Sequence, residues 1–271
     1  MGQQIVEVIL SIVDPAGRAG GDHGQDTAVL QTVQQLGALF HNGQVCGVGG
    51  IEDLVEAHTV QSSHDAAPGY ASEQFLLPLA EGSHKPYMDA EPRYEDHPAC
   101  FNAELGYFWS AADVRQNAYR SVLAGACGHT YGNHCVWSMN REPGSYFPYR
   151  WQEALNHPGA EQMRHVKALR LSHDYFSLRP ANELVVSANR GMGQECAATG
   201  NGYAYVYAPL GLPFTVELDL LKAQKAIRAC WFDPRSGESR LFGILPPGGQ
   251  TTLVPPTQGQ GCDWVLVLEN V

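Results

Sequence analysis

Residues 85–97 read KPYMDAEPRYEDH, a short extended run that ends in carboxylates, an arginine, an aromatic ring and a histidine. Pro92 disfavours helical backbone at the residue before it, so Glu91 is predicted to be extended. On a strand, Tyr87, Asp89 and Glu91 would share one face. Two acids on one face are costly to bury without partners, and the end of a strand is where a β/α barrel places its catalytic groups. The stretch therefore predicts a functional carboxylate, Glu91, in a β/α fold.

The sequence around this stretch alternates strand and helix signals from residue 55 to residue 178. Ser110 and Asp113 have the spacing of a helix capping box, and Pro158 is suited to the first turn of another helix. This alternation is typical of a parallel α/β sheet. The predicted strands are 55–61, 86–91 and an extended run over 129–139, and the predicted helices are 71–79, 110–126 and a segment that Pro158 opens.

From residue 180 to residue 271 the hydrophobic period changes to two. Tyr203, Tyr205 and Tyr207 alternate with alanine and valine, and further short runs of this kind are separated by turn sequences. This pattern indicates an all-β sandwich domain. The tyrosine stripe is either a ligand platform or one face of a sheet, and we expect the second; Trp231 and Trp264 are expected in the sandwich core. Residues 1–54 have no clear assignment and form a diverged N-terminal segment.

The composition excludes several classes of function. The 271 residues carry 17 basic against 28 acidic side chains and a net charge of −11. Without a basic cluster we expect no nucleic-acid partner, and without a long apolar run no membrane partner. Residues 1–13 lack the basic start of a signal peptide, so a cytoplasmic location is the default expectation. The seven cysteines form no CxxC pair, which predicts buried free thiols, no metal site and no cofactor.

The acidic stretch itself has two interpretations. Glycoside hydrolysis needs two carboxyl groups that flank one bond, and Arg93 could hold a carboxylate ionised. Asp89, Tyr94 and Glu95 would then lie beside Glu91 at the site. A structural ion-pair cluster at a strand end explains the same residues equally well.

A second polar stretch, residues 128–137, reads GHTYGNHCVW. Aromatic rings stack on sugar faces, and histidine and tyrosine donate hydrogen bonds. His129, Tyr131, His134 and Trp137 could line a sugar site, or they could be satisfied core residues of a barrel strand. The spacing of the two histidines does not fit the metal pair of a zinc helix.

Gln61 and His64 end the strand that precedes the acidic stretch. They are predicted to form a polar wall of the same site, because consecutive βα units end on one edge of the sheet. A solvated loop is the alternative.

Residues 89–98, DAEPRYEDHP, resemble the DGEPRYEDHP signature of the apiosidase-like glycoside hydrolases. Residues 123–134, LAGACGHTYGNH, resemble the AGAxGHTYGxH segment of that family, and residues 151–163 resemble its W…AL…PGAEQM pattern. Residues 229–238 and 263–268 are similar to the small β domain that is labelled collagen-binding in this family. The similar motifs extend from about residue 59 to residue 271.

The resemblance implies a (β/α)₈ barrel that removes apiose or a similar sugar from plant polysaccharide, with Glu91 as one of two catalytic carboxylates. It also implies that Gln61, His64, Arg93, Tyr131, His134 and Trp137 line the site. Together with the patterns above, the expected substrate-binding residues are Gln61, His64, Asp89, Arg93, Tyr94, Glu95, His129, Tyr131, His134 and Trp137.

This chain departs from the family at its N-terminal side. The second catalytic carboxylate of the family is an Asp near the middle of the barrel. Asp22, in Gly20-Gly21-Asp22, resembles the GGD of the family, but it stands too close to Glu91 in sequence for that role to be transferred. A complete barrel takes about 200 residues or more, and only residues 1–178 precede the β domain.

We therefore expect an N-terminally truncated or diverged partial barrel, 55–178, followed by a β-sandwich, 180–271. The expected function is hydrolysis of a glycosidic bond in a plant polysaccharide side chain, or a hydrolase inactivated by loss of its second carboxylate. A non-catalytic carbohydrate-binding remnant and a gene fragment are the alternatives. The carbohydrate is the expected partner, and the oligomeric state is open.

Overall fold

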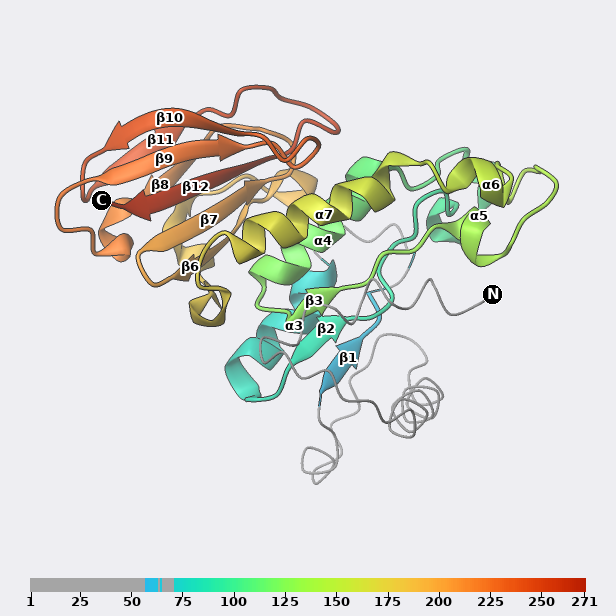
Figure 1. The fold of residues 1–271 in the computed structure, drawn as a ribbon, viewed down its shortest axis with the longest axis horizontal. Coiled ribbons are helices and arrows are strands. Elements are labelled where there is room, and N and C mark those ends of the chain that lie inside the picture. The colour runs from blue at the N-terminus through green and yellow to red at the C-terminus, as the bar shows by residue number, and fades with distance from the viewer. Residues whose placement is uncertain (1–56, 63, 65–70) are drawn as a thin grey trace, which may run out of the picture. The chain divides into compact units, whose positions relative to one another are not determined.

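The computed structural model describes residues 57–62, 64 and 71–271, so the predicted segment 1–54 lies outside the described residues. The N-terminal part of the described chain, the βα portion, contains a parallel sheet in the order β1-β2-β3, whose strands are joined by helices (Figure 1). The predicted parallel α/β portion is thus confirmed. Its elements are β1 (His58–Val60), α3 (Ala71–Gly82), β2 (Tyr87–Asp89), α4 (Ala111–Leu123), β3 (Gly128–His129), α5 (His134–Trp137), α6 (Trp151–Ala154) and α7 (Pro158–Leu171).

The parallel sheet is short and its core is small. Val60 and Tyr87 from the strands pack against Leu76 of α3 and against Ala124 and Ala126, which follow α4. Because the three strands run in parallel, their carboxyl ends lie on one edge of the sheet. The segments that follow β1 and β2 are therefore brought side by side.

The helix boundaries follow the signals in the sequence. The backbone N–H of Ser110 donates to the Asp113 carboxylate at 2.8 Å, and the Ser110 hydroxyl donates to the same oxygen at 2.7 Å. Pro158 opens α7 as predicted, at a position where its missing N–H costs nothing. Both helices therefore begin where side-chain or proline chemistry fixes their first turn.

The extended run predicted over residues 129–139 is wrong beyond residue 129. The strand ends at His129, and residues 134–137 form the helix α5. The cause is Asn133, whose side-chain oxygen accepts from the backbone N–H groups of Cys135 and Val136 at 3.0 and 3.1 Å. An Asn in this position stabilises the first turn of a helix.

The C-terminal part of the chain is an antiparallel β domain, as the two-residue period predicts. It has a six-stranded sheet in the order β10-β9-β12-β7-β6-β4 and a three-stranded sheet in the order β11-β8-β5. Its elements are β4 (Arg179–Pro180), β5 (Val185–Ser187), β6 (Cys196–Gly200), β7 (Tyr203–Ala208), β8 (Phe214–Glu217), β9 (Ile227–Phe232), β10 (Ser239–Leu245), β11 (Gln250–Leu253) and β12 (Trp264–Asn270).

The two faces of strand β7 pack into two different hydrophobic cores. Its alanine and valine side chains enter the core between the two sheets, together with Trp231 and Trp264. The opposite face carries Tyr203, Tyr205 and Tyr207, which pack on side chains of α4 and α7. Figure 1 shows these two helices against the β domain. All three tyrosines are at most 2% exposed, so they form a sheet face and not a ligand platform.

A buried ion pair also joins α4 to the β domain. The guanidinium of Arg115 donates to both carboxylate oxygens of Asp263, at 3.1 and 2.5 Å, and to the Gln162 side chain at 2.6 Å. The hydroxyl of Tyr207 donates to the same carboxylate at 3.1 Å. Both charged side chains are nearly inaccessible to solvent, so each depends on the other for its charge compensation.

Candidate active site

Glu91 lies just beyond the carboxyl end of β2. The strand ends at Asp89, two residues before the predicted end, and Glu91 follows in a bend with its side chain 40% exposed. Its carboxylate accepts a hydrogen bond of 2.7 Å from Nε2 of Gln61, and Nε2 of His64 lies 3.8 Å from its other oxygen. The structure therefore brings together the ends of two consecutive βα units at one carboxylate.

The hydrogen bonds of His64 fix the tautomer that faces Glu91. The backbone N–H of Tyr94 donates to Nδ1 of His64 at 3.3 Å, which assigns the proton of the neutral ring to Nε2, the atom that faces Glu91. This imidazole is the main cause that lowers the pKa of Glu91; partial burial opposes it and Gln61 adds to it. Glu91 is therefore held ionised, the form that a nucleophile or general base requires.

The other carboxylate of this strand, Asp89, lies deeper. It is fully buried and accepts from the backbone N–H of Ser62 at 3.2 Å. Both acids act on the hydroxyl of Tyr94. Burial raises the pKa of this hydroxyl to about 12, and the charges of Glu91 and Asp89 add to this. Asp89 is a structural anchor at the strand end in these contacts.

His129 is the register partner of Asp89 on the neighbouring strand β3. Its Nδ1 is buried without a hydrogen-bond partner, and burial lowers the pKa of the ring to about 3. The ring is therefore neutral at neutral pH, next to a buried carboxylate and not in contact with Glu91.

Three histidines from separate segments form a continuous row beside Glu91. The rings of His64 and His97 stack at 4.0 Å, and the ring of His134 meets His97 at 4.4 Å. Burial, with His64 next, lowers the pKa of His97 to about 4, and burial, with His97 and His64, lowers the pKa of His134 to about 3. Both rings are uncharged at neutral pH. Nδ1 of His97 donates to the carbonyl of Pro98 at 2.8 Å, which leaves the lone pair on Nε2, and Nε2 of His134 is buried without a hydrogen-bond partner.

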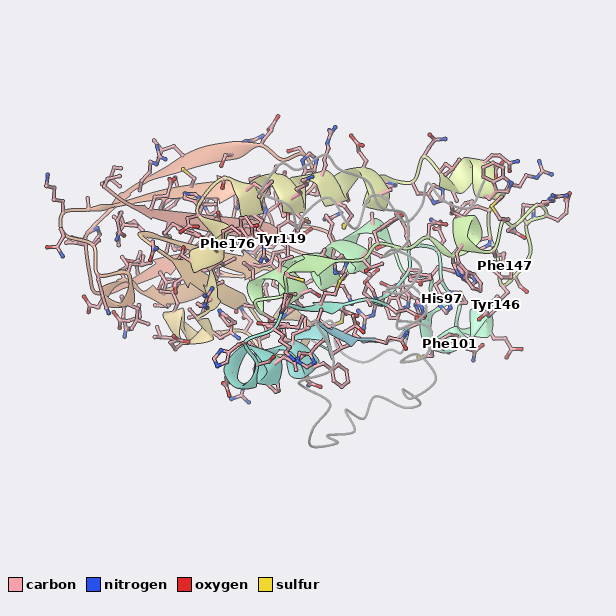
Figure 2. The ribbon with its side chains drawn as sticks, turned by 60° about the horizontal axis from the view of Figure 1, so that its bottom comes forward. His97, Phe101, Tyr119, Tyr146, Phe147 and Phe176 are labelled. Carbon is pink, nitrogen blue, oxygen red and sulfur yellow. The ribbon has the colours of Figure 1, made fainter. Side chains whose placement is uncertain are left out.

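The row continues into aromatic side chains that the sequence did not single out. Phe101 meets both His64 and His97 edge-on, and Tyr146 and Phe147 pack on His134. Figure 2 shows His97, Phe101, Tyr146 and Phe147 together at the end of the structure that carries α5 and α6. The only sequence signal was the density of rings in residues 145–149, SYFPY.

Arg93 lies behind this site and not among the groups around Glu91. Its side chain is 3% exposed, and its guanidinium stacks on the ring of Trp109 at 4.1 Å. The indole N–H of Trp109 donates to the backbone carbonyl of His64 at 3.2 Å. Arg93 thus supports the segment that carries His64.

Glu95 and Tyr131 are brought together, but not to Glu91. The Tyr131 hydroxyl donates to the Glu95 carboxylate at 2.6 Å, and that carboxylate accepts from the backbone N–H of Gly159 in the first turn of α7 at 3.1 Å. A carboxylate in this place compensates the positive end of the helix dipole. Trp137, 69% exposed on α5, completes the set of sequence-predicted residues.

Among the described residues, the groups that act most strongly on the pKa of Glu91 are His64, Gln61 and His97, and none of these is a carboxylate. Residues 57–62, 64 and 71–271 also contain no cluster of three or more His, Cys, Asp or Glu that could hold a metal ion. No helix in these residues has the length and apolar character to cross a membrane. The described cysteines are free as predicted, but only Cys135 and Cys196 are buried; Cys100 is exposed, and Cys127, Cys230 and Cys262 are partly exposed.

Comparison with known families matches the chain in two parts. A family model described as "Apiosidase-like, catalytic domain" matches residues 19–177, and one described as "Putative collagen-binding domain of a collagenase" matches residues 180–269. The first match begins well before residue 59, where the motifs in the sequence begin, and it includes Asp22. A search of curated proteins found no match.

Solved structures are similar to this chain over most of its length. One, titled "Glycoside hydrolase", is 27% identical with a TM-score of 0.70, over 78% of this chain and 52% of that one. Another, a glycoside hydrolase family 5 protein from Bacteroides vulgatus ATCC 8482, is 27% identical with a TM-score of 0.69, over 78% of this chain and 50% of that one. The chain therefore spans about half the length of these structures.

Proposed function

This chain belongs to the apiosidase-like family, and from that premise we propose that it hydrolyses a glycosidic bond with Glu91 as the nucleophile or general base. The observation that carries the proposal is the contact of Glu91 with Gln61 and His64 at the ends of two consecutive parallel strands. This is the edge where a β/α barrel holds its catalytic groups. The lowered pKa of Glu91 supports the ionised role.

The reaction requires Glu91 to act on the anomeric carbon or on the water that attacks it. In the first case the carboxylate forms a bond to the sugar, which water then cleaves; in the second it takes a proton from water. In both cases the leaving oxygen must receive a proton from a second acid with a raised pKa. Gln61 and His64 hold Glu91 in place and keep it charged.

The second acid is the open part of this proposal. Asp22 lies in the range that matches the catalytic family model, and outside the described residues. We therefore propose Asp22→Asn as the variant that tests this candidate. If Asp22 supplies the proton, the variant loses hydrolysis of sugars with poor leaving groups by about 10²- to 10⁴-fold, and an unchanged rate rejects Asp22.

The proposed substrate is apiose or a similar sugar at the end of a plant polysaccharide side chain. The family membership supports this class, and the neutral histidine row supports an uncharged ligand rich in hydroxyl groups. The net charge of −11 agrees with a substrate that is not a polyanion.

The proposal is tested by incubating the purified chain with a panel of plant cell-wall polysaccharides and identifying released sugars by chromatography. We expect release of a terminal sugar by the unmodified protein and by Glu183→Gln, a control that removes an exposed carboxylate in the β domain. Glu91→Gln is expected to release none above background. Release of the same sugar at the same rate by Glu91→Gln rejects the proposal.

A carbohydrate-binding protein without catalysis is the second candidate. It is favoured by one observation, that the described groups that act most strongly on the pKa of Glu91 are two histidines and a glutamine and include no carboxylate. Binding of an oligosaccharide by both the unmodified protein and Glu91→Gln, with no sugar released by either, would establish this candidate instead.

A further inference from the structure

Phe101 is an exposed aromatic side chain that the hydrolytic step leaves without a role. It is 52% exposed, yet its ring meets the His64 ring at 5.4 Å and the His97 ring at 4.8 Å. His64 in turn faces the Glu91 carboxylate at 3.8 Å. A single imidazole ring therefore separates Phe101 from the candidate catalytic carboxylate, and Figure 2 shows Phe101 in the same cluster as His97.

The backbone presents this ring in a conformation that is unfavourable for it. Cys100 and Phe101 have φ angles of 56° and 57°, in the left-handed region that favours glycine. Two consecutive residues with a β-carbon stay there only when their surroundings hold them, and such strain gathers at functional sites. Here the N–H of Cys100 donates to the carbonyl of His64 at 3.1 Å, and the N–H of Phe101 donates to Pro98 at 3.2 Å. The strained turn is thus tied to the residue that faces Glu91.

The exposure of the rings changes along the row. His64, His97 and His134 are each 4% exposed, whereas Phe101 leaves half of its surface open. An enzyme that removes a terminal sugar holds that sugar among its buried groups, and the rest of the polysaccharide extends toward solvent. An aromatic face takes the C–H face of a sugar ring in place of water.

We propose that Phe101 is the stacking platform for the sugar ring on the leaving-group side of the cleaved bond, the ring that stays on the polysaccharide. The ligand class is a plant oligosaccharide of at least two rings. The proposal rests on the proposed hydrolase function, and it adds a residue that determines preference for polymeric over single-ring substrates.

The test compares binding of two probes by calorimetry in a Glu91→Gln background, where turnover does not interfere. The probes are an apiose-terminated oligosaccharide from plant cell wall and methyl apioside, which has one ring. Phe101→Ala is expected to weaken oligosaccharide binding about ten-fold, the effect of one lost stacking contact, and to leave methyl apioside binding unchanged. Phe101→Tyr, which keeps the ring, is expected to bind both probes like its parent.

Two further variants separate recognition from folding. Phe101→Gly removes the ring and relieves the left-handed backbone, so its melting temperature is expected to be no lower than that of its parent while its oligosaccharide affinity falls. Phe176→Ala is the matched control. Phe176 is 62% exposed and stacks on Tyr175 at 4.2 Å, and Figure 2 shows it well away from the Phe101 cluster, toward the β domain. Its removal is expected to leave both affinities unchanged.

The remaining outcomes each reject a defined part of the account. Unchanged oligosaccharide affinity in Phe101→Ala, together with sugar release by the unmodified protein, overturns the stacking platform and leaves the hydrolase proposal in place. An equal loss for methyl apioside overturns the assignment to the leaving-group side. An unmodified protein that neither binds nor cleaves the oligosaccharide overturns the proposed function and the platform together.

Discussion

At the scale of single residues, the central contact is the one between His64 and Glu91. His64 presents its Nε2–H toward the carboxylate because its Nδ1 accepts from the Tyr94 backbone. It is the main cause that lowers the pKa of Glu91. The ionised form of Glu91 is thereby present to a lower pH than an isolated glutamate allows.

Removing this imidazole should change the pH dependence of the reaction. In His64→Ala the pKa of Glu91 rises, so the acidic limb of the kcat/KM profile moves to higher pH. Gln61→Ala should move it in the same direction by less, because Gln61 contributes less to the lowered pKa. A pH profile of sugar release measures both shifts. His173→Ala, which removes a histidine bound to Tyr205 and Glu269 instead, serves as the control, and an acidic limb at the same pH in His64→Ala contradicts the assignment.

The sequence was sufficient to predict a carboxylate at a strand end, but not all of the residues that surround it. Pro92 and the position at a strand end singled out Glu91, and the end of the preceding strand singled out Gln61 and His64. Glu95 was assigned to the same group, but the strand ends at Asp89 and the chain bends at Glu91, so strand alternation no longer applies and the carboxylate of Glu95 reaches the start of α7. Phe101 had no signal, because a left-handed phenylalanine is set by its tertiary contacts and not by its neighbours in sequence.

At the scale of elements, α5 depends on one side chain. Asn133 accepts from two backbone N–H groups at the start of the helix and donates to the carboxylate of Asp96 at 2.7 Å. Asp96 also contacts Nδ1 of His157 at 2.6 Å. The network fixes α5, and with it the ring of His134 beside His97.

Loss of this cap should be measurable as a loss of stability. Asn133→Ala is expected to lower the free energy of unfolding by about 1–2 kcal/mol, the usual cost of a lost N-cap. Asn133→Asp, which keeps the accepting oxygen, should lose less by the cap but faces the like charge of Asp96. Urea denaturation followed by circular dichroism measures both. Equal stability of Asn133→Ala and the unmodified protein would show that α5 does not need its cap.

This element also shows what patterns along the chain miss. Residues 129–139 are a mixed run of polar and apolar side chains in which strand and helix periods are hard to separate over so short a length. Asn133, as the N-cap residue, is the signal in the sequence that distinguishes a helix from a strand in this run. By contrast, α4 and α7 repeat their apolar positions over several turns and have clear first residues, so their assignment needed no tertiary information.

At the scale of the whole molecule, the β domain packs against the helices of the βα portion and stabilises them. Residues 58–271 form one compact unit, and the tyrosine face of β7 covers α4 and α7. The sequence predicted both domains and the two-residue period of β7. It did not predict that the hydroxyl of Tyr207 would meet a buried ion pair between distant segments, because Arg115 and Asp263 carry no signal of their pairing.

Loss of the Arg115–Asp263 pair should therefore destabilise the βα portion and the β domain together. Asp263→Leu or Arg115→Met leaves one charge buried without its partner and is expected to cost about 3–5 kcal/mol. The double variant Arg115→Met/Asp263→Leu should recover much of this loss, since a pair replaced by apolar groups leaves no unpaired charge. Denaturation curves of the four proteins give the coupling energy, and single variants as stable as the unmodified protein would contradict a joint function of the pair.

The most direct measurement for the whole account is the rate of terminal sugar release by Glu91→Gln relative to the unmodified protein, with oligosaccharide affinity measured on the same samples. The account predicts that the rate falls by about 10²- to 10⁴-fold while the affinity stays near that of the unmodified protein. A variant that releases sugar as fast as the unmodified protein would contradict a catalytic carboxylate at position 91.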